Sequence, residues 1–195
     1  MTESTISSRT IYRGRVLRLH VDRVKLANGR ETTREIVEHP GAAAIIPILD
    51  NGKLLVVKQY RAATHRQLME IPAGTLEPGE SPLSCAKREL VEETGYAARR
   101  IRELFSCYLA PGYSTEKIHF FLATRLIPTK GKQEEDESIA TQAIDLRQAL
   151  RAIERGKIQD AKTISALYYL ATYARRYRRV SKTRRQASVP YHKSA

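Results

Sequence analysis

The sequence predicts an α/β (α+β) fold, a sandwich in which a few helices cover a mixed central sheet, preceded by a small N-terminal antiparallel β unit. Strand-like segments recur along most of the 195 residues, whereas helical patterns are limited to about 82–94, 145–155 and 162–179. Strands and helices do not alternate regularly, and no internal repeat is visible. This distribution favours a mixed sheet over a purely parallel one.

The first forty residues are expected to form the N-terminal unit. From Ile11 to Glu38, apolar and polar residues alternate as they do in half-buried strands. Asn28-Gly29 between two such runs is a strong hairpin signal, because both positions tolerate positive φ. We therefore expect a β-hairpin unit over 1–40. It is too small to be stable alone, and a homodimer is the natural way to cover it.

The main domain is expected over 41–174. Two apolar runs, at 42–49 and 53–60, are joined by Asp50-Asn51-Gly52 and predict a second, more deeply buried hairpin. Residues 61–79 lack periodicity and contain several proline and glycine residues, so we expect a loop there. Further strands are predicted over 101–109 and 117–127.

The best-delimited element is a helix over Pro82–Thr94. Ser81 is a typical N-cap residue, proline is favoured at the first helical position, and Gly95 is a typical C-cap residue. Leu83, Ala86 and Leu90 form its expected apolar stripe.

Charge is unevenly distributed along the chain. The formal net charge is +13, and eight basic residues without any acid lie in the tail 175–195. We expect this tail to be solvated and disordered, and the alternative is that it binds nucleic acid or another polyanion. No run is long enough to span a membrane and the start lacks an apolar signal core, which predicts a cytoplasmic protein. Two cysteines are too few for a disulfide framework, and we expect both to be buried thiols.

Three glutamates in the helix carry the candidate chemistry. Glu89, Glu92 and Glu93 are spaced i, i+3 and i+4, which places them on one face. Such a cluster of like charges is stabilised by divalent cations, and hard oxygen ligands suit Mg²⁺ or Mn²⁺. An ordinary solvated acidic face is the alternative. Arg88 can orient a carboxylate beside it, which favours a site.

The segment from Gly74 to Tyr96 resembles the Nudix hydrolase signature. A glycine is followed after five residues by Glu80 and after seven more by Arg-Glu-Leu-Val-Glu-Glu-Thr-Gly-Tyr, so every fixed position of this 23-residue motif is filled. The resemblance implies the Nudix α/β/α sandwich and metal-assisted hydrolysis of a nucleoside diphosphate linked to another group.

Flanking segments over roughly 11–175 look like the ADP-ribose pyrophosphatase subfamily. They include REIVE at 34–38, QYR at 59–61, EIPAG at 70–74, Pro111 in APGYSTE, EEDESI at 134–139 and GKI at 156–158. The resemblance implies hydrolysis of ADP-ribose to AMP and ribose 5-phosphate. GDP-mannose or a UDP-sugar is the alternative substrate, and a non-catalytic nucleotide- or nucleic-acid-binding module is the less favoured alternative.

The resemblance also implies roles for particular residues. The carbonyl of Ala73, with Glu89 and Glu93, would hold Mg²⁺, with Mn²⁺ as the alternative, and Glu92 would contribute to catalysis nearby. Glu80 would brace the loop and Arg88. In the acidic loop, Glu135 aligns with the base that activates water and Glu137 with a metal contact, unless this segment is only a solvated turn. 

Further residues are expected to bind a small-molecule nucleoside diphosphate sugar. The resemblance implies that Arg34 and Glu35 serve the active site of a partner subunit in a homodimer. For Arg34 and Arg61, the alternative is a surface salt bridge. The complete set of expected substrate-binding residues is Arg34, Glu35, Arg61, Pro111, Gly112 and Glu116.

Overall fold

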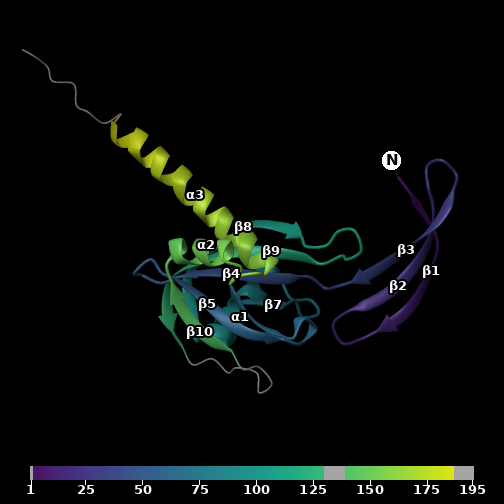
Figure 1. Cartoon of the computed structure of the whole chain (residues 1–195), viewed down its shortest axis with the longest axis horizontal. Coiled ribbons are helices and arrows are strands. Elements are labelled where there is room, and N and C mark those ends of the chain that lie inside the picture. The colour runs from purple at the N-terminus through teal and green to yellow at the C-terminus, as the bar shows by residue number, and fades with distance from the viewer. Residues whose placement is uncertain (1, 130–138, 187–195) are drawn as a thin grey trace, which may run out of the picture.

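The structure is a computed structural model that describes residues 2–129 and 139–186, with side chains through residue 173. A small sheet of three strands lies apart from a larger body, as Figure 1 shows at its right-hand side. The body is a mixed sheet with helices on both faces, which confirms the predicted α/β sandwich with a separate N-terminal antiparallel unit.

The central sheet of the body has seven strands. Five follow the order β10-β5-β4-β9-β8, while β6 pairs with β5 and β7 pairs with β4. The pairing of β4 with β9 is parallel and the others are antiparallel, so the sheet is mixed. The strands are β4 (Ala42–Ile48), β5 (Leu54–Arg61), β6 (Arg66–Glu70), β7 (Ala73–Thr75), β8 (Tyr96–Tyr108), β9 (Lys117–Pro128) and β10 (Ala140–Ile144).

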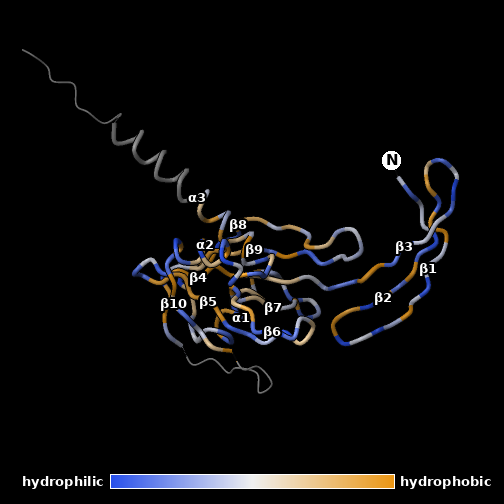
Figure 2. The backbone as a smooth tube through the Cα atoms, viewed as in Figure 1, coloured by the Kyte–Doolittle hydropathy of each residue, from blue (hydrophilic) through white to orange (hydrophobic). Residues whose placement is uncertain are grey.

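Strand β4 shows why its sequence is a continuous apolar run. Ala42, Ala44 and Ile46 belong to the core shared with α2 (Leu146–Glu154) and α3 (Ala161–Gln186). Ala43 and Ile45 point to the opposite face and pack against α1 (Pro82–Thr94). A strand that is buried on both faces has no polar alternation. Figure 2 shows hydrophobic residues in orange within the body, around the label of β4.

The structure confirms the bounds predicted for α1, Pro82–Thr94. The Ser84 amide donates to the Ser81 hydroxyl at 3.1 Å, Pro82 occupies the first turn, and Gly95 ends the helix with φ of 70°. Ala86 and Leu90 are buried as predicted, but Leu83 is 40% exposed. The expected stripe is therefore wrong at Leu83, because Cys85 contacts the sheet in its place.

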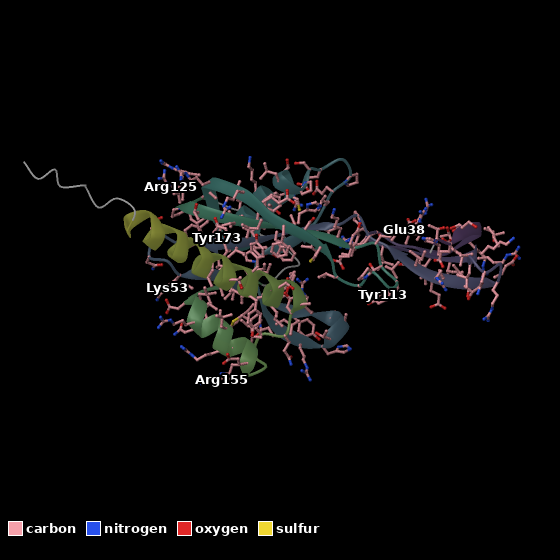
Figure 3. The ribbon with its side chains drawn as sticks, turned by 90° about the horizontal axis from the view of Figure 1, so that it is seen from above. Glu38, Lys53, Tyr113, Arg125, Arg155 and Tyr173 are labelled. Carbon is pink, nitrogen blue, oxygen red and sulfur yellow. The ribbon has the colours of Figure 1, made fainter. Side chains whose placement is uncertain are left out.

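The N-terminal sheet has one strand more than the predicted hairpin. Its strands are β1 (Ser4–Arg13), β2 (Arg18–Lys25) and β3 (Glu31–Glu38), in that order. Its contact with the body includes Val37, whose amide donates to the Tyr113 carbonyl at 2.7 Å and whose carbonyl accepts from the Thr115 amide at 3.0 Å. Figure 3 shows Glu38 and Tyr113 near this narrow junction.

Two other segments differ from the sequence predictions. The expected loop over 61–79 contains the short 3₁₀ helix Ala62–Thr64 and strands β6 and β7, which edge pairing with β5 and β4 stabilises. The tail expected to be disordered over 175–195 continues α3 as far as Gln186, and the helix projects from the body in Figure 1. Residues 187–195 lie outside the described part.

Within the described residues, no helix combines the length and apolarity needed to cross a membrane.

Candidate active site

A pocket of about 620 Å³ lies beside α1, at the loop that precedes it. Strand β7 and the first residues of the loop form one wall, and the acidic face of α1 forms another. Ala73, Arg61, Glu89, Glu92 and Glu93 line this pocket, so five of the predicted site residues lie together. The remaining lining residues are Arg15, Val16, Pro40, Gln59, Gly74, Thr75, Leu76, Glu77, Pro78 and Arg88.

Arg88 organises the carboxylates around the pocket. Its guanidinium donates to both oxygens of Glu80, from Nε at 3.1 Å and from Nη2 at 3.0 Å. Nη1 donates to Glu89 Oε1 at 2.6 Å and to Glu92 Oε2 at 3.0 Å. Nη2 also donates to the Thr75 carbonyl at 3.2 Å, which ties α1 to the loop. Glu80 thus braces Arg88.

These contacts change the acid–base properties of both partners. Hydrogen bonds from Arg88 hold the pKa of Glu80 below its ordinary value, although partial burial opposes this effect. The hydrogen bond to Glu80 likewise raises the pKa of Arg88, with the charge of Glu89 acting in the same direction. Both groups therefore stay charged at neutral pH, and the loop remains attached to the helix.

Gly74 allows Glu89 to reach the loop. A Cβ atom at position 74 would lie 1.7 Å from Glu89 Oε1, so the missing side chain is the space that the carboxylate occupies. One turn along α1, Glu93 is 3% exposed and its Oε2 accepts a hydrogen bond from the Ala73 amide at 3.0 Å. Two buried carboxylates thus meet the backbone of residues 73 and 74.

Cys85 lies beneath this loop. Its Sγ is 3.5 Å from the Gly74 carbonyl and 3.6 Å from the Thr75 carbonyl, and the residue is fully buried. Burial raises the pKa of the Cys85 thiol to about 12, and the charge of Glu89 adds to the shift. Cys107 is free and only partly buried, so the expectation of two buried thiols holds for Cys85 alone.

The donor set suits a divalent cation. Glu89 and Glu92 both direct an oxygen to Arg88 Nη1, which shows that these carboxylates converge on one cationic centre. Carboxylate and carbonyl oxygens are the hard ligands that Mg²⁺ and Mn²⁺ take. In the described residues, no group of three histidine, cysteine or acidic side chains is already arranged around a common point.

Arg61 borders the other side of the pocket and is held by Glu70. Its Nε donates to Glu70 Oε1 at 2.9 Å and its Nη2 to Glu70 Oε2 at 2.8 Å. The hydrogen bond to Glu70 raises the pKa of Arg61, and the charges of Glu93 and Asp160 contribute. Arg61 is thus close enough to Glu93 for their charges to interact.

The other predicted substrate-binding residues do not line this pocket. Arg34 pairs with Glu3 at 2.8 Å on the N-terminal sheet, and Glu35 is exposed beside it. Pro111 and Gly112 are exposed in the β8–β9 loop, and Glu116 lies at its end. Glu135 and Glu137, with the whole segment 130–138, lie outside the described residues.

Sequence reasoning assigned no role to several residues that line the pocket or support it. Arg15 and Val16 reach the pocket from the β1–β2 turn, and Gln59 precedes Arg61 on β5. Lys162 contacts Glu70 from α3, 92 positions away along the chain. Gln59 and Arg61 lie two positions apart on one strand, so their side chains share a face of the sheet, and this spacing could have placed Gln59 beside Arg61.

Two family comparisons identify the class to which this architecture belongs. Residues 38–167 match the NUDIX domain, which is more than half of the chain, and residues 3–37 match the nucleoside diphosphate sugar hydrolase N-terminal domain. The chain therefore belongs to the Nudix hydrolase family. Its N-terminal sheet places it with the members that carry the sugar hydrolase N-terminal domain. Hydrolases of this family generally use divalent metal ions.

Similar proteins lie within the same family. The chain is 43% identical over 172 residues to an ADP-ribose pyrophosphatase of Bacillus subtilis, covering 87% of this chain and 93% of the relative. It is 38% identical over 151 residues to a GDP-mannose pyrophosphatase of Escherichia coli, covering 71% and 78%. A solved structure described as an ADP compounds hydrolase has a TM-score of 0.80 at 24% identity, covering 90% of this chain and 95% of that one, and shows the same fold.

Proposed function

We propose that this protein hydrolyses the pyrophosphate bond of ADP-ribose, releasing AMP and ribose 5-phosphate. The observation that carries the proposal is the pocket lined by Glu89, Glu92 and Glu93, in which Glu93 accepts from the Ala73 amide and Glu89 packs against Gly74. The similarity to an ADP-ribose pyrophosphatase over nearly the full length of both chains supports the choice of substrate. The protein is proposed to act in the cytoplasm.

The carboxylates have distinct proposed tasks. Glu89 and Glu93, with the carbonyl of Ala73, would hold Mg²⁺, with Mn²⁺ as the alternative, and Glu137 would add a contact from the acidic loop. When bound, the ion supplies the neutralisation of charge on the diphosphate. Glu135 takes a proton from the attacking water, and Glu92 supports this chemistry from α1. Arg61 binds the diphosphate through its guanidinium, which suits phosphate geometry.

A second copy of the chain is proposed to complete the site as a homodimer. Arg34, Glu35, Pro111, Gly112 and Glu116 are the predicted substrate-binding residues that do not line the pocket of their own chain. Large apolar side chains on β1 and the turn after it are 40–57% exposed, so a partner would cover them: Ile6, Ile11, Tyr12, Val16 and Leu17. Analytical ultracentrifugation is expected to show a dimer, and a monomer with full activity would contradict this part of the proposal.

The substrate is tested with a panel. Purified protein with Mg²⁺ is incubated with ADP-ribose, GDP-mannose and UDP-glucose, and the released nucleoside monophosphates are measured. We expect release of AMP and ribose 5-phosphate from ADP-ribose, and we expect EDTA to abolish this release. Preferred cleavage of GDP-mannose would support the second candidate, which the 38% identity to a GDP-mannose pyrophosphatase favours. No cleavage of any compound would contradict both.

A further inference from the structure

A buried ion-pair group lies behind the pocket wall that holds Arg61. Arg61 comes from β5, Glu70 from the end of β6, and Asp160 and Lys162 from the start of α3. The Glu70 side chain is 1% exposed and the Lys162 side chain 10%. Burying charges is costly even when they are paired, and apolar residues often serve stability equally well. This group therefore calls for a role besides packing.

The geometry fixes one edge of the Arg61 guanidinium. Nε and Nη2 form a two-bond fork with the Glu70 carboxylate, at 2.9 and 2.8 Å. Nη1 makes no hydrogen bond or ion pair with any residue in 2–129 or 139–173. Because Arg61 lines the pocket together with Glu93, this remaining edge is available to a phosphate group.

Lys162 holds the carboxylate that holds Arg61. Its Nζ donates to Glu70 Oε2 and pairs with Asp160 Oδ1 at 3.1 Å. The next residue, Thr163, accepts a hydrogen bond from the Ile71 amide at 2.9 Å and donates to Asp160 Oδ2 at 2.5 Å. The start of α3 thus clamps both the side chain of Glu70 and the backbone that leads to Ala73.

Burial and pairing act against each other at Glu70. Burial favours the neutral acid and would raise the pKa of Glu70, but hydrogen bonds from Arg61 and the charge of Lys162 bring the pKa below its ordinary value. The carboxylate therefore remains ionised at neutral pH and keeps the fork to Arg61. Two cations and two carboxylates balance in this group.

We propose that Lys162 and Glu70 are positioning residues that hold the Arg61 guanidinium toward the pocket, where its outer edge binds the diphosphate of the substrate. Lys162 acts only through Glu70 and Arg61 and does not touch the substrate. The inference rests on the proposed function, because it takes a nucleoside diphosphate as the ligand of Arg61.

A double-mutant cycle tests whether Lys162 acts through Arg61. With the best substrate of the panel, Arg61→Ala is expected to lower kcat/KM by about 100-fold and Lys162→Met by about tenfold, chiefly through KM. The double variant should be no less active than Arg61→Ala within about twofold, because the route through Arg61 is already lost. Lys162→Arg should restore most of the activity. Lys157→Met, at an exposed lysine nearby, is the matched control and should match the wild type.

Three results separate the possible outcomes. A double variant whose loss equals the product of the single losses, or a fully active Lys162→Met, would overturn the positioning role. If Lys162→Met does not fold, as judged by circular dichroism, Lys162→Gln takes its place in the same cycle. If the wild type cleaves none of the panel, the proposed function fails, and titration with ADP by calorimetry still tests the clamp: equal ADP affinity in wild type and Lys162→Met would overturn it.

Discussion

The two charged clusters that border the pocket differ in their balance. Around Arg88, one guanidinium faces four carboxylates, and Glu93 lies one helical turn beyond Glu89 along α1. The second cluster contains two cations, Arg61 and Lys162, and two carboxylates, Glu70 and Asp160. Among the described residues, carboxylates outnumber cations in the first cluster, whereas the two kinds of charge balance in the second. The first cluster thus suits the proposed metal ion, and the second holds Arg61, the proposed ligand of the diphosphate.

The largest effect is expected for the acidic cluster at Glu93. Glu93→Gln keeps the size of the side chain and its hydrogen bond from the Ala73 amide but removes one negative charge. Turnover should fall by about 10²-fold or more and the affinity for Mg²⁺ should also fall, so that more Mg²⁺ is needed for half-maximal activity, while the fold persists. Kinetics against Mg²⁺ concentration, with thermal melting, measure this. Full activity would contradict the metal-site assignment.

Glu135 tests the proposed base in the acidic segment 130–138. Glu135→Gln should leave metal affinity nearly unchanged and slow the chemical step by about 10²-fold at neutral pH. The defect should shrink as the pH rises, because hydroxide replaces the missing base. The measurement is kcat from pH 7 to 10. A fully active variant would move the base to Glu134 or Glu137.

Glu70, at the centre of the balanced cluster, should affect stability as well as substrate binding. Since the folded pKa of Glu70 is lowered, its ionised form stabilises the protein above the ordinary carboxyl pKa of 4.5, and this contribution is lost as pH falls through the folded pKa. Glu70→Gln should therefore lower the free energy of unfolding by about 2 kcal/mol at pH 7. Urea titrations at pH 7 and pH 4 should show this gap narrowing; a constant gap would contradict it.

A smaller effect is expected where the acidic cluster meets the loop. In Gly74→Ala the new Cβ displaces the end of the flexible Glu89 side chain, which can move without unfolding the protein. We expect about a tenfold loss of kcat/KM and little change in Tm, because the carboxylate is misplaced but not removed. Steady-state kinetics and calorimetry measure both quantities. A large fall in Tm with unchanged kinetics would contradict this reading of the contact.

Local signals explain what could be predicted from the sequence. Ser81, Pro82 and Gly95 delimit α1 through contacts within a few residues, so its bounds were predictable. Leu83 shows the limit of the same reasoning. Helical periodicity places Leu83 on the same side as Ala86 and Leu90. Packing against the sheet buries Ala86 and Leu90 but leaves Leu83 exposed.

Long-range contacts explain what could not be predicted. Strands β6 and β7 have five and three residues and depend on pairing with β5 and β4, which a local pattern does not encode. The Glu70–Lys162 contact joins residues 92 positions apart and has no local signature. By contrast, Glu89, Glu92 and Glu93 were identified as a group because one helix carries them all.

Cys85 gives the protein a built-in reporter of motion at the pocket. The thiolate is the form that reacts with alkylating reagents, and this thiol is both buried and far from ionised at neutral pH. Labelling at Cys85 must therefore wait until α1 separates from the loop at Gly74 and Thr75. Cys107, partly exposed on β8, provides a second thiol in the same chain for comparison. The labelling rate of the natural sequence consequently reports how often the floor of the pocket opens, without any introduced probe.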